Sequence, residues 1–212
     1  MTNSWRIPAI LQITVLIILC LQLNGRPALG QERSLGQVLA DDFRRSGTVV
    51  GRYFTQPIRW DRGDWLRFGG VVGITALAMP LDEPFRDASQ EWRKPSNSFV
   101  FDVARRVGSK EVAVPSAMLV YGFGWLTENE PTRVTGRLLL EAMVTAGITT
   151  TLAKTAIGRH RPYRNNGPQR YTPPGLDSPD RSLPSGHGTT AWLVAGVLSR
   201  RTENTALEIL CY

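Results

Sequence analysis

Residues 154–187 of this 212-residue chain read KTAIGRHRPYRNNGPQRYTPPGLDSPDRSLPSGH, and the rest of the sequence is arranged around this stretch. It is rich in cations, and it contains both histidines of the chain, His160 and His187. One apolar segment precedes the stretch and another follows it, so we expect a charged loop that joins two helices.

Lys154 and Arg161 are seven residues apart, which is close to two turns of an α-helix, so the spacing predicts that both project from one helical face. Pro162 follows directly, and a residue before a proline is disfavoured in the α conformation, which places the pair on the last two turns of a helix. Cations are favoured there by the helix dipole, and the Arg fork suits phosphate oxygens. Taken alone, the pair is more simply interpreted as a solvated basic helix end.

The tetrapeptide Pro184-Ser185-Gly186-His187 precedes the apolar segment GTTAWLVAGVL, a pattern typical of a helix start. The backbone N–H groups at such a start form an anion site, and Gly186 lets an oxyanion approach the backbone closely. Ser185 can add a hydroxyl hydrogen bond, and His187 has a side chain that can donate a proton near neutral pH. An ordinary helix cap followed by an exposed histidine is an equally good interpretation of the tetrapeptide alone.

Together the two motifs resemble the first two signature motifs of the type 2 phosphatidic acid phosphatases, whose superfamily also contains bacterial acid phosphatases and vanadium-dependent haloperoxidases. The resemblance implies an all-α helical bundle and metal-independent hydrolysis of phosphomonoesters, with no cofactor unless the chain is a vanadate-dependent haloperoxidase. It implies that phosphate is bound by Lys154, Arg161, Ser185 and Gly186. His187 would be the general acid that protonates the leaving group.

The third signature motif of that family supplies a further Arg, a nucleophilic His and the Asp that orients it. The only Ser-Arg pair downstream is Ser199-Arg200, and the spacing would place the nucleophile at Ala206 and its orienting Asp at Leu210. The sequence therefore resembles a family member that is truncated at its C-terminus. Three functions remain open: a phosphatase acting on a lipid phosphate or another phosphomonoester, a non-catalytic phosphate-binding remnant, and a vanadate-dependent haloperoxidase.

Residues 1–30 are typical of a secretory signal peptide, because Arg6 precedes a strongly apolar run and Ala28-Leu29-Gly30 has the small-x-small form of a cleavage site. The alternative is an uncleaved N-terminal anchor, since about 17 apolar residues can just span a bilayer. Either interpretation predicts export, to the periplasm or to a membrane with the site on its outer side.

The remaining chain divides into a polar N-terminal segment, residues 31–63, and a helical phosphatase-like domain, residues 64–212. Asp41-Asp42 is best interpreted as a solvated helix end, Asp64 as a helix N-cap, and Glu141 as a polar contact within the bundle or a surface group. The pattern predicts helices over residues 35–43, 66–81, 97–107, 112–126, 135–160 and 188–201.

The formal net charge of +7 suits an anionic substrate or an anionic membrane surface. Nucleic acid is a weaker partner because no nucleic-acid-binding motif occurs, and two separated histidines with two separated cysteines predict no zinc site. The apolar segments are shorter than the ~20 residues that comfortably span a bilayer. We therefore expect bundle helices that associate with a membrane, and the sequence leaves the oligomeric state open.

Overall fold

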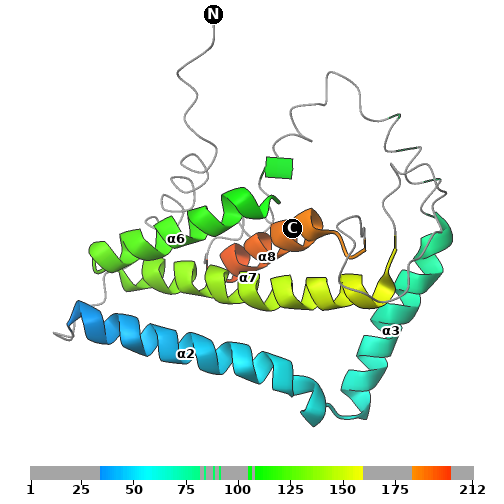
Figure 1. Cartoon of the computed structure of the whole chain (residues 1–212), viewed down its shortest axis with the longest axis horizontal. Helices are drawn as coiled ribbons and strands as arrows, with labels where there is room; N and C mark the ends of the chain where they lie inside the picture. The colour runs from blue at the N-terminus through cyan, green and yellow to red at the C-terminus, as the bar shows by residue number, and fades with distance from the viewer. Residues whose placement is uncertain are drawn as a thin grey trace, which may run out of the picture.

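The computed structural model describes residues 34–81, 84, 88, 91, 105–106, 108–159 and 183–201. Within these residues the chain forms five longer α-helices and two short 3-10 helices, with no β-strand, so the predicted all-α fold is confirmed (Figure 1). The elements are α2 (Leu35–Thr55), η1 (Gln56–Arg59), α3 (Arg62–Ala78), η2 (Met79–Leu81), α6 (Lys110–Leu126), α7 (Glu130–Ile157) and α8 (Gly186–Arg201).

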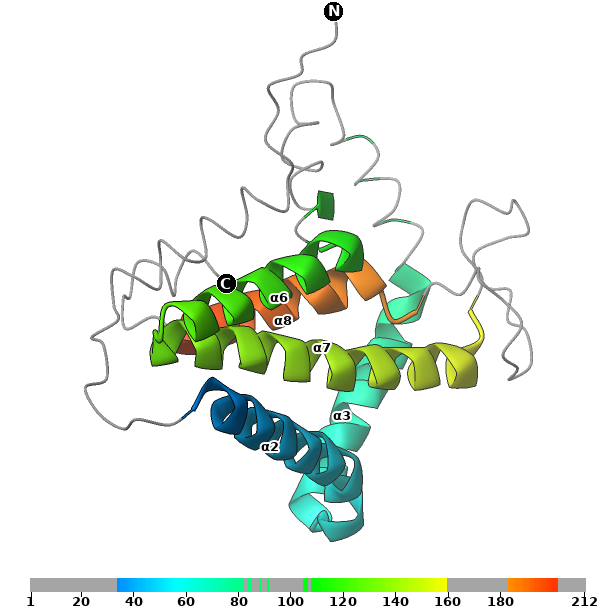
Figure 2. The same cartoon turned by 60° about the vertical axis from the view of Figure 1, so that its left-hand side comes forward.

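Helices α6, α7 and α8 form the central layer of the protein (Figures 1 and 2). A three-residue connection joins α6 to α7, which makes the two helices antiparallel. At the far end of α8, Arg201 donates from Nε to Thr135 Oγ1 at 3.0 Å and from Nη2 to the Pro131 carbonyl at 3.2 Å. Helix α8 therefore also runs antiparallel to α7, and it begins near the last turns of α7.

Two glycines allow α6 and α7 to lie almost backbone to backbone. A Cβ atom added at Gly136 would overlap the backbone of Tyr121, and one added at Gly124 would overlap the backbone of Arg133. A side chain at either position would force the helices apart. The buried apolar core beside this contact is small and consists of Ala113, Ala117, Leu139 and Val194.

Several helix boundaries differ from the sequence-based prediction. The N-cap of α3 is Asp61, whose carboxylate accepts from the Asp64 N–H at 2.8 Å, so the prediction of Asp64 as the N-cap was wrong. Two acidic residues three apart form a reciprocal capping box, and the upstream member is the cap. Helix α7 begins five residues before the expected start, because Asn129 caps it and Pro131 is tolerated in a first helical turn.

Helix α2 continues to Thr55, beyond the predicted residues 35–43, and lies along α7. Tyr53 shares a 3.1 Å hydrogen bond with Thr149 of α7. The expected signal segment, residues 1–30, and the expected helix at 97–107, apart from residues 105–106, lie outside the described residues.

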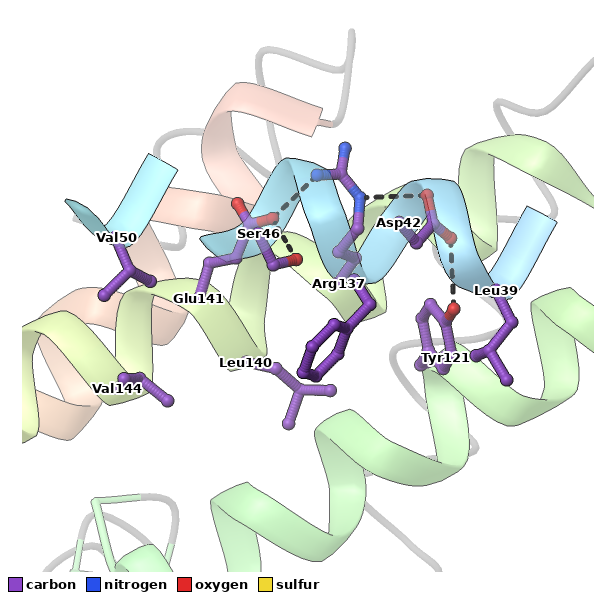
Figure 3. Close-up of a pocket in the computed structure, with 10 residues that line it drawn as sticks. Leu39, Asp42, Ser46, Val50, Tyr121, Arg137, Leu140, Glu141 and Val144 are labelled. Atoms are coloured by element: carbon purple, nitrogen blue, oxygen red, sulfur yellow. Dashed lines mark hydrogen bonds and ion pairs between the residues drawn. The ribbon is translucent and has the colours of Figure 1, made fainter. Parts of the chain in front are cut away.

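A buried group of charged residues joins α2 to α7 (Figure 3). Asp42 forms ion pairs with Arg133 and, at 3.5 Å, with Arg137, and it accepts a 3.0 Å hydrogen bond from the Tyr121 hydroxyl. The prediction that Asp42 lies at a solvated helix end is therefore wrong. Two arginines one turn apart on α7 face Asp42 across the interface between the helices.

Glu141 completes this network. Its Oε1 accepts from Arg137 at 2.7 Å and from the Ser46 hydroxyl at 2.6 Å, and its side chain is buried. Of the two sequence-based alternatives for this residue, the polar contact within the bundle is confirmed.

Helix α3 extends away from the other helices at an angle (Figures 1 and 2) and buries none of its residues. Its exposed apolar side chains point in all directions around the axis: Trp65, Leu66, Phe68, Val71, Val72, Ile74 and Leu77. Among the described residues, no helix combines the length and apolar character required to cross a bilayer.

The charged network generates a stability prediction. Asp42→Ala should lower the free energy of unfolding by about 3 kcal/mol, because removing one partner leaves buried guanidinium groups without their counter-charge. Denaturant unfolding measures the change, and Arg45→Ala, an exposed charge on the same helix, is the matched control. Equal stability of the two variants would mean that the network does not hold α2 in place.

Candidate functional site

Lys154 of the first motif and Ser185, Gly186 and His187 of the second lie where the last turn of α7 meets the start of α8, at one end of the central layer (Figures 1 and 2). Helix α7 ends at Ile157 because Gly158 adopts the left-handed conformation, with φ of 64°, and its N–H bonds to the Lys154 carbonyl at 3.0 Å. A non-glycine residue would be strained there. The helix end therefore leaves Lys154 in the last turn.

This end of α7 corrects one sequence-based expectation. Lys154 and Arg161 were predicted to share one face on the last two turns of a helix, but Gly158 stops the helix before Arg161. The sequence-based prediction ended the helix just before Pro162, because a residue that precedes a proline is disfavoured in the α conformation. In the structure the helix ends at Gly158, four residues earlier. Arg161 itself lies outside the described residues.

Helix α8 begins at Gly186, two residues before the predicted start. The Ser185 hydroxyl accepts from the Gly188 N–H at 3.2 Å, and the Ser185 carbonyl accepts from the Thr189 N–H at 2.9 Å. Ser185 thus acts as a helix cap, and His187, in the first turn, has an exposed side chain. A hydroxyl oxygen that accepts one hydrogen bond still carries a proton to donate, so the capping role leaves Ser185 able to bind an anion.

The side chain of Lys154 reaches the start of α8. Its Nζ lies 3.7 Å from the position that a Cβ atom on Gly186 would occupy. These residues are thirty-two positions apart in the sequence, so the fold, and not the local chain, brings the ammonium group to the N-terminal backbone of α8. Both the ammonium and the N-terminal end of a helix dipole attract negative charge, and together they define a small positive region.

Helix α6 contributes an acidic neighbour to this region. A hydrogen bond to its own backbone N–H lowers the pKa of the exposed Glu111 carboxyl, desolvation opposes this shift, and a hydrogen bond with Ser109 and the nearby Lys110 and His187 side chains lower the pKa further. The interaction with His187 brings the first turn of α6 into the electrostatic environment of the first turn of α8. No pattern in the sequence marks Glu111, because its relation to His187 exists only after α6 and α8 have packed against α7.

The structure therefore brings together Lys154, Ser185, Gly186 and His187, four of the five residues selected from the sequence. Within the described ranges, no group of three or more His, Cys, Asp or Glu residues could hold a metal ion. The site that the described residues form is cationic and is suited to an oxyanion.

Comparison with known protein families supports this interpretation. Residues 135–210 match the sequence model of the PAP2 superfamily, and the part of the chain that the structure describes forms helices and no strand. The domain contains most of α7, all of α8 and the residues of both motifs. The predicted resemblance is confirmed. No curated protein and no solved structure was found to match the chain.

Proposed function

We propose that this protein binds the phosphate group of a phosphomonoester where α7 ends and α8 begins. The observation that carries the proposal is the position of the Lys154 ammonium beside Gly186 at the N-terminus of α8. Membership of the PAP2 superfamily implies phosphate-ester substrates in general, which agrees with this cationic site.

Each residue of the site would have a distinct role. Lys154 supplies a positive charge, and the first backbone N–H groups of α8 donate to phosphate oxygens. The Ser185 hydroxyl, whose oxygen already accepts from Gly188, donates its proton to the same group. Arg161, which follows α7 in the sequence, would add a two-pronged guanidinium contact.

The proposed reaction is metal-independent phosphomonoester hydrolysis, in which a nucleophile attacks phosphorus and the leaving oxygen takes a proton. His187 would be the proton donor, because its exposed side chain lies in the first turn of α8, next to the proposed phosphate position. The positions at which the family motif would provide a nucleophile and its partner are Ala206 and Leu210, whose side chains can serve neither purpose. We therefore expect this chain to bind phosphomonoesters but to hydrolyse them slowly.

Binding is tested with inorganic phosphate. Lys154→Ala and Arg161→Ala should each weaken its affinity by about 1.5–3 kcal/mol, the usual contribution of a hydrogen bond to a charged group. Titration calorimetry gives the affinities, and Arg200→Ala, an exposed cation at the other end of α8, should leave them unchanged. If Lys154→Ala binds phosphate as tightly as the unaltered protein, the proposed site is wrong.

Turnover is tested with a chromogenic phosphomonoester. The purified chain should hydrolyse it at least about a thousandfold more slowly than a PAP2 enzyme that carries the third motif, because positioning and electrostatics alone preserve only a small part of catalysis. If the chain instead hydrolyses the ester as fast as that enzyme, and His187→Ala abolishes the activity, another group acts as the nucleophile. His160 is then the first residue to examine.

We also propose that the protein is exported, as its N-terminal sequence predicts, and that it associates with a membrane surface through α3. A helix that is apolar all round is suited to an apolar surrounding. Trp60, Trp65 and Phe68 form a cluster at its start, with ring centroids 4.9–6.1 Å apart. Aromatic side chains beside basic ones are typical of the membrane interface, and Arg62 and Arg67 supply the cations here.

The membrane proposal predicts flotation of the protein with anionic phospholipid vesicles. Ile74→Asp, on the exposed surface of α3, should reduce binding about tenfold or more, since burial of one large apolar side chain contributes roughly 1.5–3 kcal/mol. Val49→Asp is the control, because Val49 is an exposed apolar residue on α2. Equal binding of the two variants would exclude α3 as the contact surface.

A further inference from the structure

Helix α2 is amphipathic, but its apolar face is not the face that meets α7. Asp42, Ser46 and Tyr53 form ion pairs and hydrogen bonds with α7, and their spacing of four and seven residues places them on one face of α2. Among the α2 side chains that the structure describes, Asp42 alone is buried. An amphipathic helix normally buries its apolar face, so α2 keeps that face available for a further contact.

The apolar stripe of α2 consists of Leu39, Phe43, Val50 and Phe54. Their spacing of four, seven and four residues places them on one face, about 70° around the helix axis from the face that contacts α7. Leu39 is 48%, Phe43 82% and Phe54 37% exposed. The apolar stripe therefore runs along the open side of α2, next to its contact with α7.

A pocket of about 230 Å³ lies beside the apolar stripe, between α2 and α7 (Figure 3). Leu39 and Val50 line it from α2, Leu140 and Val144 line it from α7, and Tyr121 of α6 lies at its edge. An apolar cavity of about 150 Å³ can bind benzene, so this pocket has room for one aromatic ring.

Phe43 also borders this pocket, yet 82% of its surface remains exposed. A projecting aromatic side chain and a hollow that can hold one thus lie next to each other on the same surface. Such a surface is self-complementary, because a two-fold axis between the two features brings the projection of each copy to the hollow of the other.

We propose that the apolar stripe and the pocket form the interface of a two-fold symmetric dimer of this chain. Phe43 of each copy enters the pocket of the other copy, and the two α2 helices lie antiparallel along their apolar stripes. The interface does not include Lys154, so the dimer and the phosphate site are independent proposals.

The distribution of charge favours a second copy as the occupant. The charged groups at the pocket wall are already joined to one another by ion pairs, so an uncharged ring can enter without displacing an ion. The exposed arginines of α2 lie about 100° or more around the helix axis from the middle of the apolar stripe: Arg44, Arg45 and Arg52. Two positively charged copies can therefore meet at the stripe without burying an unpaired charge.

The surface is also large enough for a stable dimer. Helix α2 has 21 residues, which makes it about 30 Å long, and with the neighbouring part of α7 the surface is about 20 Å wide. These dimensions give roughly 600 Å² for each copy, or about 1,200 Å² in total, which is the lower end of the range for specific, stable interfaces.

The test measures the dissociation constant of the dimer by sedimentation velocity of the full chain over a range of concentrations. Phe43→Arg should raise this constant at least about a hundredfold, because the substitution occurs twice in a symmetric dimer and a single interface hot spot contributes about thirtyfold or more. Val49→Arg is the matched control, because Val49 is an exposed apolar residue of α2 outside the stripe, and it should leave the constant unchanged. Circular dichroism should show the same helix content in both variants.

A second variant tests the pocket side of the contact. Val144→Asp should also dissociate the dimer, since a carboxylate would then face the incoming ring. A mixture of Phe43→Arg with Val144→Asp should regain a dimer. In the mixed dimer one Phe43 enters an unaltered pocket, and at the other contact the introduced arginine faces the introduced aspartate. Misfolded variants would not regain a dimer on mixing.

The proposal is overturned if the unaltered chain is monomeric at every concentration, if the dimer persists in Phe43→Arg, or if mixing the two variants restores no dimer. A monomeric chain that loses binding to anionic vesicles in Phe43→Arg would assign the apolar stripe to a membrane surface, which also overturns the dimer. The affinity of Lys154→Ala for inorganic phosphate reports on the phosphate site separately.

Discussion

The close contact between α6 and α7 at Gly124 and Gly136 is the constraint on which the rest of the structure depends. Because these glycines have no side chains, the two helices pack without a gap in an antiparallel arrangement. Helix α8 then packs antiparallel to α7 and begins near the last turn of α7. The candidate site consists of residues from the end of α7 and the start of α8.

Charged and titratable side chains act differently in the two polar regions of the protein. Between α2 and α7, Asp42 and Arg137 are buried and paired, so desolvation has to be offset by short contacts and the group is locked in one arrangement. At the helix ends, Lys154 is half-buried and His187 is exposed, and the surrounding charge is mostly positive. The first region fixes the helices, and the second retains the capacity to bind a ligand.

The two regions are connected by α7. The arginines and Glu141 that hold α2 belong to its first half, and Lys154 belongs to its last turn. The ion pairs and hydrogen bonds of Asp42 and Ser46 therefore fasten α2 to the first half of α7, away from Lys154.

The sequence alone predicted the all-α fold, because helical periodicity, prolines and glycines act over a few neighbouring positions, and its two motifs predicted the PAP2 resemblance. It misplaced the end of α7, since two competing stop signals, Gly158 and Pro162, lie four residues apart and the first one prevails. It also assigned Asp42 to solvent, because its partners Arg133 and Arg137 are about ninety positions away in the chain. Only the packing of the helices decided that contact. The same holds for the position of Lys154 beside Gly186 and for the electrostatic influence of His187 on Glu111, since each joins residues that are far apart in the sequence.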